Sequence, residues 1–270
     1  MKIGVTTSLF NVCDDEVVEV VPKFSGLGFD YIEVVSRNPK SIDIEEFLKV
    51  LEKYNVSVYA VCAWCNYTYQ NPAHENGYVR KTYIDYMKDL VDLASNLGAK
   101  IIVTSAGIIK GISREEAYKY CAECLREIEN YSSLHRIKIA VEAVNRFITN
   151  FINNTDQALK LIKHVNKPFI GITLDTFHMN IEEKSIGNSI IAAGKSLFHF
   201  HLADNNRLAP GLGHMDFTKI IDNLKEIGYE GNLSMEIQAT DDPVKEAKFG
   251  LNFIENILSS KKIVNREADF

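Results

Sequence analysis

The sequence predicts an α/β protein folded as a single (β/α)8 TIM barrel. Eight strand-like runs alternate with segments of helical periodicity along the chain, and eight is the number of strands in such a barrel. The length of 270 residues suits one barrel domain. The runs are almost continuously apolar, which is typical of parallel strands that are covered on both faces. We expect the barrel to span residues 1–258 and a polar C-terminal tail to span residues 259–270.

The expected strands follow one another at intervals of about one strand plus one helix. In chain order they are Ile3–Thr7, Tyr31–Val35, Val56–Cys62, Lys100–Thr104, Lys138–Glu142, Phe169–Asp175, Leu197–Leu202 and Asn232–Ile237. Helical periodicity fills the intervals, as in Tyr83–Leu97 and Glu116–Leu134. Several of these helices end at a glycine, for example Gly98 and Gly228, which indicates a C-terminal cap before the next strand.

A doubly wound open sheet would show the same alternation of strands and helices. Such a sheet carries a glycine-rich phosphate-binding turn after its first strand. The corresponding segment here, residues 6–10, has the sequence TTSLF and contains no glycine. The barrel is therefore the favoured architecture.

The composition limits the kinds of molecule that the protein is expected to bind. The chain has 30 basic and 36 acidic residues, a net charge of -6, which argues against nucleic acid as a partner and favours a small molecule. The N-terminal segment lacks the pattern of a secretory signal, and no apolar stretch reaches the length of a membrane span. We expect a cytoplasmic protein that has no membrane partner.

Two cysteine pairs have the C-x-x-C spacing of zinc ligands. Cys62 and Cys65 follow an expected strand, whereas Cys121 and Cys124 lie inside an expected helix. Because one pair follows a strand and the other lies in a helix, we expect the two pairs to lie in different layers. Structural zinc sites usually draw such pairs from tight loops, so we expect no shared zinc site.

Four potential metal ligands stand at the ends of the last four expected strands: Glu142, Asp175, His201 and Glu236. The gaps between them are 33, 26 and 35 residues, about one βα unit each. Barrel enzymes keep their chemistry at the carboxyl ends of their strands, where these side chains would converge. Oxygen and nitrogen donors of this kind suit Mn²⁺, Co²⁺ or Mg²⁺.

Such a site would assist proton transfer beside a carbonyl. A divalent ion that holds a carbonyl and a neighbouring hydroxyl stabilises an enediolate as the adjacent carbon loses its proton. Two carboxylates on opposite faces of that carbon give epimerisation, a proton shift between carbons one and two gives aldose–ketose isomerisation, and loss of a β-hydroxyl gives dehydration. The metal ligands alone do not determine which of these reactions the site would catalyse.

Two long loops and one further histidine complete the candidates. The loop over residues 63–76 contains Trp64, Tyr67 and Tyr69 and would form a lid or one wall of a sugar pocket. The loop Ala203–His214 would lie on the same rim. His199 shares the face of His201 by the period of two in a strand, and we interpret it as a core histidine near the metal rather than a ligand.

Three motifs resemble those of a known family. They are the segment Val141–Phe147, the string LDTFHMNIEE at Leu174–Glu183, and the stretch from His199 to Gly213, with Glu236 after them. They are similar to the D-tagatose/D-psicose (allulose) 3-epimerase group of the xylose-isomerase-like sugar isomerase/epimerase superfamily. The resemblance covers the last four strands well and the N-terminal half only by its pattern.

The resemblance implies a divalent-metal-dependent ketose 3-epimerase that exchanges protons at carbon three through a metal-bound cis-enediolate, with Mn²⁺ as the expected ion and a homodimer or homotetramer as the expected assembly. It implies that Glu142 and Glu236 act as the acid/base pair, and that His178 and Arg207 bind the oxygen on carbon two. The metal ligands that it implies are Glu142, Asp175, His201 and Glu236.

One position departs from the family's pattern. Six residues after the first catalytic glutamate these epimerases usually carry a second glutamate that contacts the substrate, whereas this chain has Ile148. The substrate is therefore open, and an aldose–ketose isomerase, an inosose-type dehydratase or a C-glycoside-cleaving enzyme remain alternatives. A DNA-repair endonuclease would need more histidines than the seven here and a basic face. A noncatalytic sugar-binding barrel would have no use for paired carboxylates at a metal.

Overall fold

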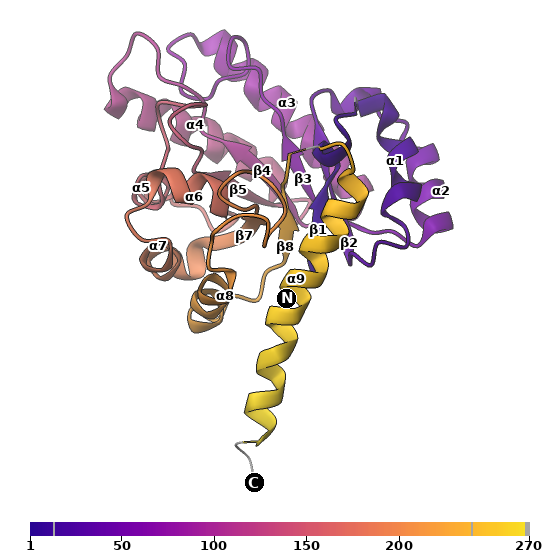
Figure 1. The fold of residues 1–270 in the computed structure, drawn as a ribbon. Coiled ribbons are helices and arrows are strands. Elements are labelled where there is room, and N and C mark those ends of the chain that lie inside the picture. The colour runs from indigo at the N-terminus through magenta and orange to yellow at the C-terminus, as the bar shows by residue number, and fades with distance from the viewer. Residues whose placement is uncertain (13, 239, 268–270) are drawn as a thin grey trace.

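The protein is a closed eight-stranded parallel barrel. The computed structural model describes residues 1–12, 14–238 and 240–267, with side chains as far as Ser260. The strands follow one another around the barrel in chain order, and β1 pairs with both β2 and β8 (Figure 1). The prediction of a (β/α)8 barrel is confirmed.

Each predicted strand-like run overlaps one strand, and predicted and observed ends differ by at most two residues. The strands are β1 Ile3–Thr6, β2 Tyr31–Ser36, β3 Val58–Ala63, β4 Ile101–Ser105, β5 Lys138–Glu142, β6 Ile170–Asp175, β7 Leu197–Leu202 and β8 Leu233–Met235. The largest differences are at the start of β3 and the end of β8, so Glu236 lies one residue beyond its strand.

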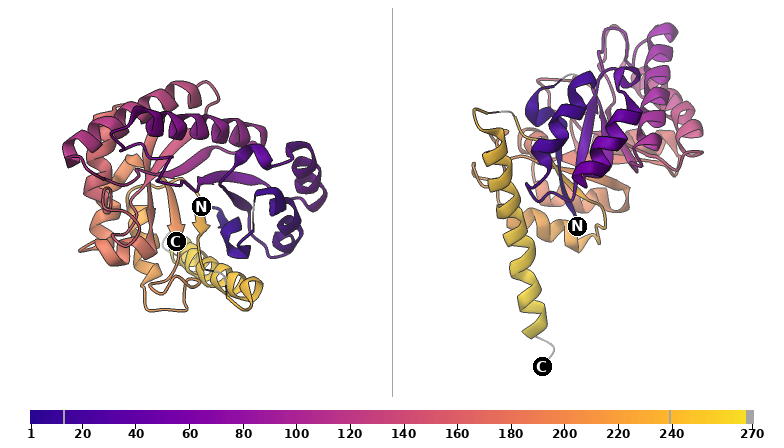
Figure 2. Two further views of the ribbon diagram at one scale, coloured as in Figure 1. Left: turned by 90° about the horizontal axis from the view of Figure 1, so that it is seen from above. Right: turned by 90° about the vertical axis from the view of Figure 1, so that its right-hand side faces the viewer.

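Helices surround the strands in the view along the barrel (Figure 2). They are α1 Val17–Phe24, α2 Ile44–Tyr54, α3 Gly77–Asn96, α4 Arg114–Ser132, α5 Thr155–Val165, α6 Thr176–Glu182, α7 Ile186–Ala193, α8 Phe217–Glu226 and α9 Pro243–Glu267. Gly98 and Gly228 follow α3 and α8 with φ of 73° and 66°, the left-handed conformation that ends a helix at low cost for glycine.

Side chains of the strands alternate between two apolar clusters. Ile102 and Phe200 are fully buried between the strands and the helices, in the larger cluster. Ile101, Val103 and Ala140 point to the interior of the barrel, in the smaller cluster. Because successive side chains of a strand point to opposite faces, His199 and His201 share the interior face while Phe200 faces the helices.

The barrel interior also contains a buried polar layer. The Tyr31 hydroxyl donates to the carbonyl oxygen of Leu233 at 2.7 Å and lies 3.0 Å from Ser234 Oγ. Ser234 Oγ in turn lies 3.0 Å from His199 Nε2. These bonds join β2, β7 and β8 inside the barrel, where a polar atom without a partner would be costly.

A substitution at Gly4 tests how tightly this layer packs. A Cβ added at Gly4 on β1 would overlap the ring of Tyr31. The hydrogen bonds of the Tyr31 hydroxyl hold that ring in place. We expect Gly4→Ala to lower the free energy of unfolding by about 1–3 kcal/mol, the usual cost of overpacking. The control is Gly77→Ala at the start of α3, where an added Cβ meets Arg80 Nη2 at 3.7 Å. Equal denaturation midpoints for the two variants in urea would contradict the expectation.

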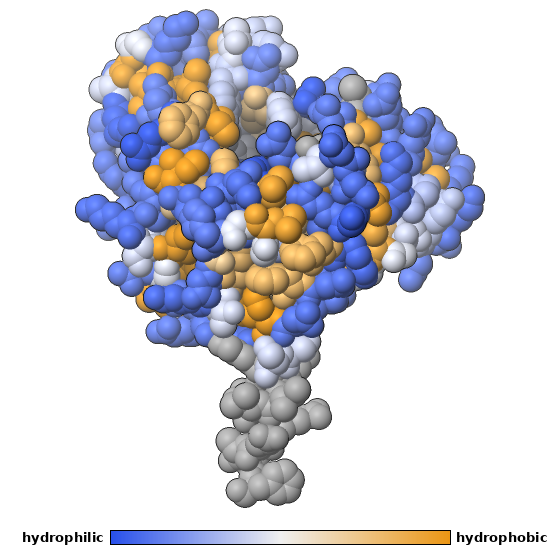
Figure 3. Space-filling view, viewed as in Figure 1, coloured by the Kyte–Doolittle hydropathy of each residue, from blue (hydrophilic) through white to orange (hydrophobic). Residues whose placement is uncertain are grey.

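The C-terminal helix α9 extends past the barrel in Figure 1 and in the right-hand view of Figure 2. It runs to Glu267, so residues 259–267 of the predicted tail continue this helix, and residues 268–270 lie outside the described residues. Within the part of the chain that the structure describes, no helix is both long and apolar enough to cross a membrane. Hydrophilic residues cover most of the face shown in Figure 3, which is also hollowed at the top, between the lobe of α3 and α4 and that of α1 and α2.

Candidate metal centre

The four side chains predicted as metal ligands meet at the carboxyl ends of β5 to β8. Glu142 and Asp175 are the last residues of their strands, His201 is the last but one of β7, and Glu236 follows β8 directly. One ligand atom from each lies within 4.8 Å of all the others. This cluster of two glutamates, an aspartate and a histidine is able to hold a metal ion.

Burial and unmet hydrogen bonding support a bound cation at this cluster. Asp175 and His201 are fully buried and Glu142 is 8% exposed. Glu142 Oε1 is buried and accepts no hydrogen bond from any residue that the structure describes, with His201 Nδ1 3.5 Å away. A buried carboxylate oxygen without a donor is costly, and a divalent ion would satisfy it. The residues therefore fit a metal of the oxygen-preferring kind.

His201 presents Nδ1 to the cluster because Glu33 fixes its other ring nitrogen. Glu33 Oε1 lies 3.1 Å from His201 Nε2, and a carboxylate can only accept, so Nε2 carries the proton. On the opposite edge of the ring, Nδ1 lies 3.1 Å from Glu236 Oε2. This carboxylate–histidine pairing is the arrangement that orients metal-binding histidines in many proteins.

Glu33 binds both histidines of β7. Its Oε2 accepts from His199 Nε2 at 2.9 Å, and the side chains of Glu33, His199 and His201 are all fully buried. Burial alone would raise the pKa of Glu33, but the two imidazoles outweigh it and hold the pKa well below the usual value. Glu33 is thus held as a carboxylate, and His199 is fully buried on the interior face that it shares with His201, as the strand period predicted.

Arg207 lies against two of the candidate ligands. Its Nη1 donates to Asp175 Oδ2 and its Nη2 to Glu236 Oε2, both at 2.8 Å. Arg207 has φ of 65° in the loop after β7, a left-handed conformation that is uncommon for residues other than glycine and often marks a functional site. Burial raises the pKa of Glu236, but Arg207 and His201 outweigh it and keep the carboxylate ionised.

His178 on α6 is the remaining predicted contact to substrate. It is 4% exposed, and its Nδ1 lies 2.8 Å from Asn145 Nδ2 in the loop after β5. The amide nitrogen can only donate, so Nδ1 accepts and Nε2 of His178 is left to donate elsewhere.

The loop after β5 is shaped by neighbouring charges. Arg146 donates from its backbone and guanidinium nitrogens to Glu182 of α6, at 2.7 and 2.8 Å. Ile148, at the position of the usual substrate-contacting glutamate, is 53% exposed on the same loop. This part of the rim therefore carries an exposed apolar side chain.

The two cysteine pairs lie in different layers, as predicted. Cys62 is on β3, whereas Cys121 and Cys124 are on α4, and among the described residues no cysteine belongs to a potential metal cluster. Burial raises the pKa values of the Cys65 and Cys124 thiols to about 12, which disfavours the thiolate that zinc binding requires.

Glu33 and Asn145 are the site residues that sequence reasoning missed. Neither is among the candidate site residues that the sequence indicates. The available signal for Glu33 was an acid in the middle of the apolar run Tyr31–Ser36, because a buried charge in a strand needs a partner.

A search against protein-family models matches residues 22–257 to the family described as xylose isomerase-like TIM barrel. Among curated relatives, the D-psicose 3-epimerase of Ruminiclostridium cellulolyticum is 32% identical over 224 residues, which cover 80% of this chain and 76% of the relative. The L-ribulose 3-epimerase of Methylomonas sp. is 29% identical over 216 residues, 77% of this chain and 74% of the relative.

Solved structures agree in fold over almost the whole chain. The crystal structure of D-psicose 3-epimerase with D-tagatose from Clostridium cellulolyticum H10 has a TM-score of 0.87 and 25% sequence identity. The match covers 96% of this chain and 99% of that structure. The similarity therefore extends to the N-terminal half, where the sequence motifs alone gave only a pattern.

Proposed function

The chain belongs to the xylose isomerase-like TIM barrel family, and from that premise we propose that it is a divalent-metal-dependent ketose 3-epimerase. Its similarity to curated 3-epimerases supports an enzyme of the sugar epimerase type. The observation that carries the proposal is the pair of carboxylates, Glu142 and Glu236, in one cluster with His201 and Asp175. Two carboxylates at one metal are what inversion at carbon three requires.

We assign the proton transfers to Glu142 and Glu236. They project from β5 and from the end of β8, which are not neighbours in the barrel, and so can approach a sugar from two sides. One removes the proton from carbon three and the other returns a proton to the opposite face. A divalent ion held by the four ligands would polarise the ketose carbonyl and its neighbouring hydroxyl, a contribution of several kcal/mol to stabilising the developing charge.

His178 and Arg207 would stabilise the oxygen on carbon two. Both are held in place by neighbours: the Arg207 guanidinium by Asp175 and Glu236, and His178 by Asn145 through Nδ1. Fixed donors near an oxygen that gains negative charge lower the barrier without reorganising during the reaction. The donor set also leads us to propose Mn²⁺ as the working ion, with Co²⁺ and Mg²⁺ as the other candidates.

Isotope exchange tests the proposed function. We expect Mn²⁺-loaded protein in D₂O to convert ketoses into their carbon-three epimers with deuterium at carbon three, measured by NMR. Chelation with EDTA should abolish the reaction and added Mn²⁺ should restore it. Label at carbon one or two with an aldose product would indicate an isomerase, and loss of water would indicate a dehydratase. Either outcome, or full activity after chelation, would overturn the proposal.

A further inference from the structure

A second pocket lies on the same rim as the metal cluster, over the carboxyl ends of β2, β3 and β4. Its volume is about 650 Å³, and its walls are formed by Arg37 after β2, the loop that follows β3, and Ile108 and Lys110 after β4. Tyr67 joins this pocket to the metal cluster. Its hydroxyl lies 2.6 Å from Ser105 Oγ, and Ser105 is the register partner of Glu142 in the β4–β5 pair. A ligand held at Glu142 therefore has this pocket beside it.

The pocket is lined by two positively charged side chains and further hydrogen-bond donors, and by no acid among the described residues. Its lining includes Arg37, His74 and Lys110 and contains neither aspartate nor glutamate among the described residues, although the chain has more acidic than basic residues. Neither the Arg37 guanidinium nor the Lys110 amine forms an ion pair with a described residue. Positive groups that no carboxylate neutralises attract an anion.

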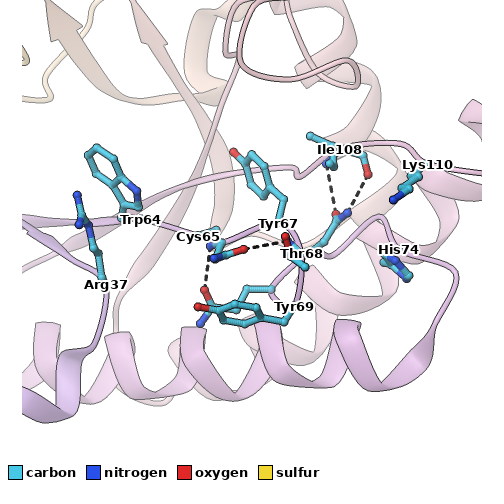
Figure 4. A pocket seen from close by; sticks show the side chains of 12 residues that line it. Arg37, Trp64, Cys65, Tyr67, Thr68, Tyr69, His74, Ile108 and Lys110 are labelled. Atoms are coloured by element: carbon cyan, nitrogen blue, oxygen red, sulfur yellow. Dashed lines mark hydrogen bonds between the residues drawn. The ribbon is translucent and has the colours of Figure 1, made fainter.

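Two of the donors, Arg37 and His74, are held in defined positions. The Arg37 guanidinium lies 4.4 Å over the ring of Trp64, a cation–π contact that fixes it at one end of the pocket (Figure 4). His74 and Lys110 appear together at the other end of that view. His74 Nδ1 accepts from the backbone N–H of Asn76 at 3.0 Å, so its Nε2 carries a proton and is a donor.

We propose that this pocket binds an anionic group, a phosphate or a carboxylate, at the end of the ketose that is remote from carbon three. The proposal rests on the proposed function, because it takes the sugar to be held at Glu142. Ile148 agrees with it: the rim after β5 lacks the carboxylate that would repel an anionic sugar. The substrate class is thus a ketose phosphate or a keto sugar acid, rather than the free ketose.

Substrate comparison with the Mn²⁺-loaded full chain tests this inference. We would measure kcat/KM for a free ketohexose, for the same sugar with a terminal phosphate and for the same sugar with a terminal carboxylate. We expect at least one anionic sugar to exceed the free sugar by roughly tenfold or more, the effect of a charge-assisted hydrogen bond. The two anionic arms show which group the pocket prefers, and added salt should reduce that preference. Equal values for all three sugars would overturn the proposal.

Charge removal locates the effect in the pocket. Lys110→Gln should raise KM for the anionic sugar by roughly fivefold and leave the free sugar unchanged, whereas Arg37→Gln, at the other end of the pocket, should have a smaller effect on the anionic sugar. The control, Lys49→Gln, removes the same charge from the exposed face of α2 and should alter neither substrate. Variants that weaken both sugars alike would contradict the pocket's role.

Calorimetry separates this proposal from the proposed function. If no sugar is epimerised but the anionic sugar still binds with an affinity that depends on Lys110, the proposed reaction fails and the anion site stands. If free ketoses are epimerised and the anionic sugars have no advantage in affinity or turnover, the anion site fails and the reaction stands.

Discussion

Replacement of Glu236 by glutamine is expected to lower epimerisation at carbon three roughly a thousandfold, within the range that general acid–base groups contribute. The amide keeps the shape of the side chain but removes the base and one anionic ligand from the cluster. Glu236 Oε2 now accepts from Arg207 Nη2 at 2.8 Å and lies 3.1 Å from His201 Nδ1. Because these groups remain, the variant should fold and lose chemistry rather than structure.

Substitutions of the two glutamates should have different effects on proton exchange if each glutamate serves one face of carbon three. With Glu236→Gln, Glu142 is still able to exchange the proton of one epimer with solvent, although it completes no inversion. With Glu142→Gln, the other epimer should exchange. NMR of each epimer in D₂O, with Mn²⁺ at saturating concentration, measures exchange and inversion separately.

Glu226→Gln on the exposed surface of α8 is the control for loss of one carboxylate and should match the unsubstituted protein. Near-normal epimerisation by Glu236→Gln would show that Glu236 is not a base. Loss of exchange from both epimers in both variants, with the metal bound, would contradict a two-base mechanism.

The ligand cluster could be predicted from the sequence because its signals are local. Glu142 and Asp175 each end an apolar run of one strand, and parallel strands of a barrel bring such ends to one rim whatever the details of packing. The spacing by βα units supplied the rest. The predicted ends of β8 were less accurate, because the strand stops at Met235. Glu236 lies just beyond it and still donates its backbone N–H to the carbonyl oxygen of Leu202.

Glu33 and the anion pocket depend on contacts that no local pattern records. Glu33 meets His201 across 168 residues of sequence, and only the closure of the barrel brings β2 opposite β7. The pocket draws Arg37, His74 and Lys110 from three separate loops, each of which is an ordinary polar connection when considered alone. Loop conformation decides whether such charges converge, and the period of a strand or helix contains no information about it.

Glu33→Gln is expected to weaken Mn²⁺ binding by roughly 10- to 100-fold, the usual effect of losing the carboxylate behind a metal-binding histidine. Glu33 Oε1 now holds the proton of His201 on Nε2, which leaves Nδ1 free to face the cluster. A neutral amide accepts less strongly than a carboxylate, and it can turn its NH₂ group toward the ring. Either change disfavours the tautomer that metal binding requires.

Titration calorimetry with Mn²⁺ on the metal-free protein measures this effect without reference to turnover. The control is Glu129→Gln: Glu129 is 3% exposed on α4 and pairs with Lys167 at 3.0 Å, so this variant also removes a buried paired carboxylate. Both variants should lose stability, because each leaves a cation or imidazole with a weaker partner. Only Glu33→Gln should lose metal affinity, and it should therefore gain less thermal stability when Mn²⁺ is added. If its affinity for Mn²⁺ equals that of Glu129→Gln, Glu33 only fills the barrel, and another contact must orient His201.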